Sequence, residues 1–186
     1  PDLADPAHPG SAVGLIVAAL DARRLSHGTP FTVLCCDNLP HNGKLVRNLV
    51  LEFARRRDEA LAHWIERHVT FPSTMVDRIV PATSAGDLTE TRLALGTLDS
   101  APVVCEPFRQ WVIEDAFVAG RPPWEAAGAE LVTDVAPFEA MKLRLLNGSH
   151  SALAYLGFLA GHETIWQVAA QPDFTALMRA LMDEAS

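Results

Sequence analysis

The sequence is poor in the features that mark several large classes of protein. It has 15 lysines and arginines against 23 acidic residues, which gives a formal net charge of -8. The electric field of this negative charge would repel nucleic acid and anionic membrane surfaces. No apolar run approaches the roughly 20 residues of a membrane-spanning helix, and the first residues lack the basic start of a signal peptide. We therefore expect a cytoplasmic protein whose partner is a small molecule, with neither nucleic acid nor membrane bound.

Cysteine is also scarce, with residues only at Cys35, Cys36 and Cys105. The number is odd, and two of the three are adjacent in an apolar run where neighbouring side chains would face opposite ways. We expect reduced, buried cysteines, as in cytoplasmic proteins.

Several motifs of known chemistry are missing. The sequence has no G-x-G-x-x-G, no P-loop and no G-x-S-x-G nucleophile turn. Its seven histidines form neither H-x-H nor H-E-x-x-H, and no C-x-x-C occurs, so we expect no metal site.

What is present is an alternation of helical and strand patterns. The residues favour a helix over 11–25, a buried parallel strand over 31–36 and one long helix from about 45 to 68. A turn-rich segment, 37–43, lies between that strand and that helix. Further strands are predicted over 75–80, 102–106 and 111–113, with a short helix around 88–95.

The chain changes character near residue 135. After Pro137 it is almost wholly helical, with helices predicted over 139–160, 163–170 and 173–184. We interpret residues 1–135 as part of a Rossmann-type parallel α/β domain and residues 136–186 as the first helices of a mostly α-helical C-terminal domain.

A cation, an amide and an imidazole recur among leucines at the start of that helical part. On an α-helix Lys142 and His150 lie about 80° apart, with Asn147 about 60° beyond His150. All three could edge one pocket. On spacing alone a structural interpretation is favoured, in which Lys142 extends to solvent, Asn147 with Gly148 marks a helix end or kink, and His150 is a hydrogen-bonded core residue.

Four motifs occur in one order along the chain, spanning Asp37–Gly43, Phe71–Ile79, Glu106–Asp115 and Lys142–His150. Together they resemble the long-chain mannitol dehydrogenase family of polyol and hexuronate dehydrogenases. The resemblance covers the chain from about Gly10 onward.

The resemblance implies a metal-independent, NAD(P)-dependent secondary-alcohol dehydrogenase. The motif lysine, here Lys142, would be the general base, and the motif histidine, here His150, would position substrate and lysine. Asn38 and Asn147 would hold the oxygen that becomes a carbonyl. Glu139, one turn before Lys142, would link the site to water for proton movement.

These roles are chemically reasonable on these residue types. Lysine, with an ordinary pKa near 10.4, is a poor base at neutral pH, but apolar burial lowers a lysine pKa; we expect Leu143, Leu146 and Leu153 to surround Lys142. Amide NH2 groups can stabilise a developing alkoxide by about 2 to 4 kcal/mol each.

The position of Asn38 also suits a role in the site. Asn38 follows a predicted parallel strand, where open α/β sheets bind ligands, although an ordinary Asx-turn residue is equally consistent. Asp37 and Asn38 are the candidate cofactor contacts.

In the family pattern the Gly-rich dinucleotide turn and the acidic residue that selects NAD over NADP precede this segment, and further helices follow it. NAD is the expected cofactor, with NADP possible, and the isolated chain is expected to bind it weakly. The first substrate class is a mannitol-like polyol and its 2-ketose; hexuronates such as fructuronate are the alternative. The full-length enzyme is expected to be a monomer, whereas the isolated chain could be a non-catalytic fragment that self-associates.

Overall fold

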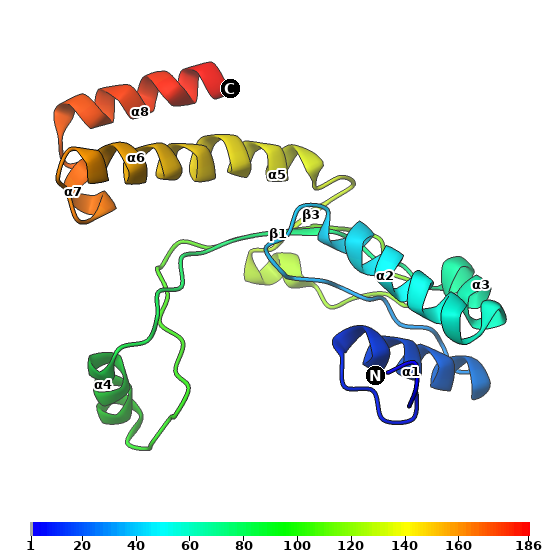
Figure 1. Cartoon of the computed structure of the whole chain (residues 1–186). Helices are drawn as coiled ribbons and strands as arrows, with labels where there is room; N and C mark the ends of the chain where they lie inside the picture. The colour runs from blue at the N-terminus through cyan, green and yellow to red at the C-terminus, as the bar shows by residue number, and fades with distance from the viewer. Residues whose placement is uncertain (1) are drawn as a thin grey trace. The chain divides into compact units, whose positions relative to one another are not determined.

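The computed structural model describes residues 2–186, which fall into two compact units, 2–133 and 134–186 (Figure 1). The first unit contains α1 (Ala12–Leu25), α2 (Asn42–Arg57), α3 (Glu59–His68), β1 (Thr74–Asp77), α4 (Ala85–Leu95), β2 (Gln110–Glu114), the 3-10 turn η1 (Trp124–Ala127) and β3 (Glu130–Val132). The second contains α5 (Ala136–Met141), η2 (Lys142–Asn147), α6 (Gly148–Leu159), α7 (Ile165–Ala169) and α8 (Pro172–Ala185). Over the described range, no helix is both long and apolar enough to cross a membrane.

The core of the first unit is built by α1, α2 and α3. The helix predicted over 11–25 is confirmed: Ser11 is its N-cap, and the Ser11 hydroxyl accepts a hydrogen bond from the N–H of Gly14. Apolar side chains from the three helices and from the extended segments beside them form one cluster. Its buried members are Val17, Leu20, Val33, Val50, Leu51, Ala54, Leu61, Ala62, Ile65 and Val69.

The single helix predicted from 45 to 68 is wrong, because the chain breaks at Asp58. Asp58 has extended backbone angles, and its carboxylate accepts a hydrogen bond from the N–H of Ala60, so that it caps α3. The same carboxylate accepts from Arg24 of α1 at 2.7 Å. A helix cap and an ion pair with α1 therefore replace the continuous helix.

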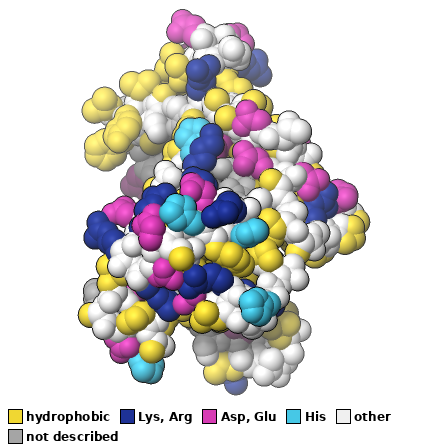
Figure 2. Space-filling model, turned by 90° about the vertical axis from the view of Figure 1, so that its right-hand side faces the viewer, with side chains coloured by type: hydrophobic (Ala, Val, Ile, Leu, Met, Phe, Trp, Pro, Cys, Tyr) yellow, Lys and Arg dark blue, Asp and Glu magenta, His cyan; other side chains and the backbone are white. Residues whose placement is uncertain are grey.

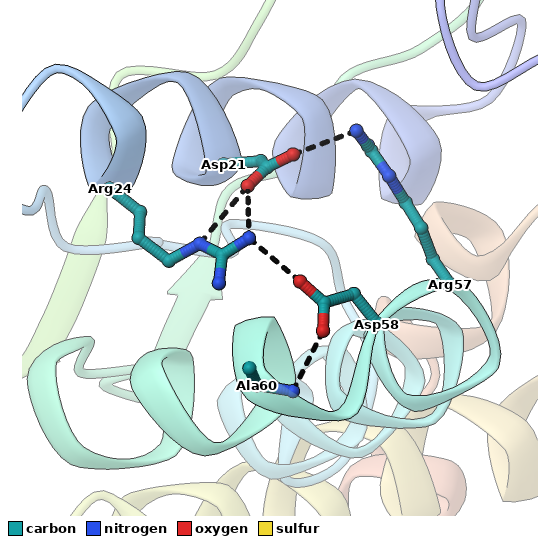
Figure 3. Close-up of polar contacts among 5 residues, drawn as sticks. All are labelled: Asp21, Arg24, Arg57, Asp58 and Ala60. Carbon is teal, nitrogen blue, oxygen red and sulfur yellow. Dashed lines mark hydrogen bonds and ion pairs between the residues drawn. The ribbon is translucent and has the colours of Figure 1, made fainter.

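Asp58 belongs to an ion-pair network that joins α1 to the α2–α3 corner (Figure 3). Asp21, which is 7% exposed, accepts from Arg24 at 2.9 Å and from Arg57 at 2.8 Å. The Ala60 N–H lowers the pKa of the Asp58 carboxyl below its ordinary 3.8. The contribution of Asp58 to stability is thus present above the unfolded pKa and is lost as pH falls through the lower folded pKa.

We expect Asp21→Asn to destabilise the chain by about 2 kcal/mol, because two partly buried guanidinium groups lose their shared carboxylate. Urea unfolding at neutral pH measures this loss. Asp5→Asn is the matched control, because Asp5 is exposed and pairs with the exposed His8. This change should alter the free energy of unfolding by less than about 0.5 kcal/mol. Equal effects of the two changes would show that the network is not stabilising.

The sheet of the first unit is small and mixed. β1 pairs with β2 antiparallel, with Thr74 opposite Ile113, and β2 pairs with β3 parallel, with Val112 opposite Glu130. β2 confirms the strand predicted at 111–113. β1 ends at Asp77, three residues earlier than predicted.

Two predicted strands are wrong. Residues 31–36 are extended and partly buried but form no strand. Val33 N–H donates to Thr70 C=O, and the hydroxyls of Thr32 and Thr70 share a hydrogen bond. Residues 102–106 likewise form no strand, and Glu106 N–H donates to Ile79 C=O. A strand needs a hydrogen-bonded neighbour along its length, and apolar sequence alone does not supply one.

α4 confirms the short helix predicted around 88–95 and begins with a capping box between Ser84 and Asp87. Figure 1 shows α4 at the far end of two long extended segments. None of its residues is buried, and Leu93 is 79% exposed.

Aromatic side chains pack beside the sheet. The ring of Trp111 in β2 lies 5.7 Å from that of Trp124 in η1, and Phe117 contacts Trp124 edge-on at 5.4 Å. Trp111 therefore belongs to the packed part of the first unit.

The side-chain surface mixes both charge signs. Figure 2 shows Lys and Arg interspersed with Asp and Glu over the face it presents.

The cysteines are free, but the expected burial is wrong for two of them, because Cys36 and Cys105 are exposed and Cys35 is half-buried. Cys36 comes at the end of the segment that forms no strand, which leaves it uncovered.

The second unit is helical, as predicted, and α6 packs against both α7 and α8 (Figure 1). The buried residues of α6 are Ser149, Leu153 and Gly157, which lie four apart on one stripe. A Cβ added to Gly157 would overlap a methyl group of Val168 in α7. This close approach fixes the rotation of α6 about its axis.

Candidate active site

In the first unit, the candidate residues Asp37 and Asn38 lie in the loop between the extended segment 31–36 and α2. Both are exposed, and the N–H of Asn38 donates to the Asp37 carboxylate at 2.8 Å. The N–H of Leu39 donates to the Asp37 carbonyl at 2.9 Å. The loop is thus a tight turn that presents a carboxylate and an amide next to each other.

Asn42, the first residue of α2, anchors this loop. Its side chain is fully buried; Nδ2 donates to the Asp37 carbonyl at 2.9 Å and to the Thr74 carbonyl at 2.9 Å, while Oδ1 accepts from Thr74 N–H at 2.9 Å. Thr74 Oγ1 in turn donates to the Cys35 carbonyl at 2.8 Å. The Asn42 amide therefore joins the loop to β1, and the Thr74 hydroxyl joins β1 to the extended segment.

The residue after this anchor must be glycine. A Cβ on Gly43 would lie 2.5 Å from the Phe71 carbonyl oxygen and 2.6 Å from the backbone of Pro72, distances that a side chain cannot adopt without moving the backbone. Gly43 lets α2 start directly against the segment that leads into β1. Asn42 and Gly43 belong to the motif Asp37–Gly43, although no role was predicted for either residue. The sequence signal for their role is an Asn–Gly pair directly after the loop.

In the second unit, four candidate residues lie along one continuous helical run, α5–η2–α6. Glu139 is in α5 and is 9% exposed, Lys142 and Asn147 are half-buried at the two ends of η2, and His150 is exposed in the first turn of α6. Asp37 and Asn38 belong to the first unit. The predicted site residues thus form two sets, one in each unit.

The surroundings expected for Lys142 differ in part from those observed. Leu153 is buried, but Leu143 is 47% and Leu146 is 41% exposed, so the prediction that they enclose Lys142 is wrong. Leu143 and Leu146 both lie in η2, which is a π-helix: the N–H of Gly148 donates to the carbonyl of Leu143, five residues back. Side chains in this segment therefore do not follow α-helical spacing.

The described residues contain no group of three or more His, Cys, Asp or Glu side chains placed to hold a metal ion. The polar groups available are the amides, the lysine amine, the imidazole and the carboxylates named above. In each unit an amide can donate hydrogen bonds to an oxygen, and in the second unit the lysine amine can take up a proton.

Comparison with known proteins decides the family. A family model described as the mannitol dehydrogenase Rossmann domain matches residues 4–126, and one described as the mannitol dehydrogenase C-terminal domain matches residues 134–186. The chain belongs to the mannitol dehydrogenase family. The resemblance inferred from the four motifs and the Rossmann-type α/β class are thereby confirmed.

Two solved structures of dehydrogenases are similar to the chain. A D-sorbitol dehydrogenase in substrate-free form has a TM-score of 0.92 and 41% identity, over 98% of this chain and 38% of the other. The Pseudomonas fluorescens mannitol 2-dehydrogenase, in a ternary complex with NAD and D-mannitol, has a TM-score of 0.84 and 50% identity, over 98% of this chain and 37% of the other.

Among curated relatives in the family, the D-mannonate oxidoreductase of Escherichia coli (strain K12) is 54% identical over 181 residues, which is 97% of this chain and 37% of the relative. The mannitol 2-dehydrogenase of Cereibacter sphaeroides is 48% identical over 177 residues, 95% of this chain and 37% of the relative. The chain therefore spans little more than a third of the length of the relatives it matches.

Proposed function

We propose that this chain is the catalytic part of an NAD-dependent polyol dehydrogenase that interconverts a mannitol-like alcohol and its 2-ketose without a metal. The observation that carries the proposal is the single helical run bearing Glu139, Lys142, Asn147 and His150, in a chain 50% identical to a mannitol 2-dehydrogenase whose structure contains NAD and D-mannitol. The first unit would contact the cofactor and the second would supply the base.

In this proposal the Lys142 amine takes the proton of the substrate hydroxyl. Asn38 and Asn147 donate N–H hydrogen bonds to the same oxygen as it acquires negative charge. His150 positions substrate and lysine, and Glu139, one turn before Lys142, passes the proton on toward solvent. Proton uptake and oxygen stabilisation are thereby assigned to different groups.

The residues present fit one end of a dinucleotide. Asp37 and Asn38 form an exposed pair of hydrogen-bonding groups after an extended segment, held in place by the buried Asn42, whereas residues 2–186 contain no Gly-rich turn to grip phosphates. When bound, NAD+ accepts the hydride from the carbinol carbon. Asp37 and Asn38 would hold its nicotinamide end, and NADP is the alternative cofactor.

A hexuronate substrate is the second candidate, favoured by the 54% identity to a D-mannonate oxidoreductase. The proposed base and oxygen-binding amides would serve this reaction equally. A carboxylate substrate would need an additional cation at the pocket.

The test is to assay the full-length protein with NAD+ and NADP+ against mannitol, arabinitol and sorbitol, and with NADH and NADPH against fructuronate and tagaturonate. We expect turnover with NAD and a hexitol; turnover of fructuronate alone would select the second candidate. An enzyme that is folded, as judged by circular dichroism, yet inactive on all five compounds with both cofactors would contradict the proposal.

A further inference from the structure

The helix that bears Lys142, Asn147 and His150 changes its winding between them. α5 is α-helical up to Met141, η2 is π-helical from Lys142 to Asn147, and α6 is α-helical from Gly148. A π-helical turn inside an α-helix is rare and is frequently found at functional sites. Here it begins at the proposed base and ends at the proposed oxygen-binding amide.

The change in winding alters which residues share a face. Each π-helical residue turns the chain by roughly 82° instead of the 100° of an α-helix. Five such steps place Asn147 about 50° past Lys142, and three α-helical steps then bring His150 to within about 10° of Lys142. The three side chains occupy an arc of about 60°, whereas an unbroken α-helix would spread them over about 140°.

The flanking helices are fixed in rotation, so they cannot undo this arrangement. After the turn, Ser149 and Leu153 are buried and Gly157 packs directly on Val168. Before it, Val135 is fully buried and Glu139 is 9% exposed. The rotation imposed by η2 therefore decides where Asn147 points.

We propose that η2 is a positioning element: its π-helical winding gathers Lys142, Asn147 and His150 on one face of the helix so that amine, amide and imidazole meet one substrate oxygen. The inference rests on the proposed function, because it assumes that these three groups act together. Leu145 and Leu146 matter here for the length that they add to the turn and not for their chemistry.

Two deletions in the full-length enzyme distinguish the effect of helix winding on the direction of Asn147 from the effect of losing a residue. Removing Leu146 or removing Gly148 shortens the helix by one residue, and each lets η2 become α-helical while α6 stays within about 10° of its present rotation. With Leu146 removed, the three groups still span about 60°. With Gly148 removed, Asn147 lies about 140° from Lys142 and the arc grows to about 160°.

We expect the Leu146 deletion to keep kcat within about tenfold of wild type. We expect the Gly148 deletion to lower kcat by about 100-fold or more, the effect of losing one oxygen-binding donor. Adding Leu146→Asn to the Gly148 deletion returns an amide to the face and should restore kcat to the level of the Leu146 deletion. Equal kcat losses in the two deletions, with equal urea unfolding midpoints, would overturn the inference.

A failure of the proposed function can be distinguished from a failure of this inference. If Asn147→Leu in the full-length enzyme leaves kcat unchanged, Asn147 has no catalytic role; if it lowers kcat while the two deletions stay equal, only the positioning role is wrong.

Should either deletion variant fail to fold, moving the amide by substitution decides the question. The double change Leu146→Asn with Asn147→Leu keeps the amide about 30° from Lys142 on the π-helix, whereas Asn147→Gly with Gly148→Asn sends it about 150° away. We expect the first pair to retain at least ten times more kcat than the second. Equal losses would again overturn the inference.

Discussion

Lys142→Ala in the full-length enzyme should lower kcat by about 100- to 10,000-fold, the usual contribution of a general base, while the Kd for NAD changes by less than about threefold. The variant lacks the amine that takes the hydroxyl proton, but it keeps Asp37 and Asn38, the proposed cofactor contacts. Steady-state kinetics and a fluorescence titration with NAD measure the two quantities. A small primary amine added to the assay should restore part of the lost rate, because it can occupy the space vacated by the side chain.

The chain offers a matched control for this experiment. Its one other lysine, Lys44, is exposed on α2, and Lys44→Ala should leave kcat/KM within about threefold of wild type. If Lys142→Ala retains more than a tenth of the wild-type kcat, a different group is the base. Rescue by added amine would be absent in that case.

The largest loss of stability should come from Asn42→Leu. The buried amide bonds the Asp37 carbonyl and both backbone groups of Thr74, and the substitution leaves these groups without that partner in a site closed to water. We expect a loss of about 3 to 5 kcal/mol in the free energy of unfolding, measured by urea titration of this chain. The loop with Asp37 and Asn38 would lose its anchor, so full-length activity should fall as well.

Asn48→Leu is the control for that change. Asn48 lies on the same helix and is exposed, so its substitution should alter the free energy of unfolding by less than about 0.5 kcal/mol. A loss below about 1 kcal/mol for Asn42→Leu would mean that water replaces the amide and that the loop has another support.

Helices were the part of the fold that sequence could predict, because their apolar spacing is local. α1 and the three helical stretches after Pro137 follow directly from that pattern. The break at Asp58 could not be predicted in this way, since its ion pair with Arg24 joins residues 34 positions apart. The segment 31–36 was misassigned for the same reason: its composition is that of a strand, but strand formation depends on a neighbour.

In the candidate site, too, local features could be predicted from the sequence, whereas features that depend on distant contacts could not. The residue types at 38, 142, 147 and 150 point to the chemistry, and their family pattern supplies the roles proposed for them. The winding of η2 was not predictable from α-helical spacing, because its residues are ordinary helix formers. The anchoring role of Asn42 was hidden too, since its partner Thr74 lies 32 residues away.

The aromatic packing of the first unit has a practical consequence for the unfolding measurements. Trp111 and Trp124 are in contact within that unit, while Trp166, in the second unit, is 79% exposed. Tryptophan emission will therefore shift mainly when the first unit opens, whereas far-ultraviolet circular dichroism records the helices of both. Superimposable curves from the two probes would show that the units unfold as one cooperative block, and separated curves would assign each transition to its unit.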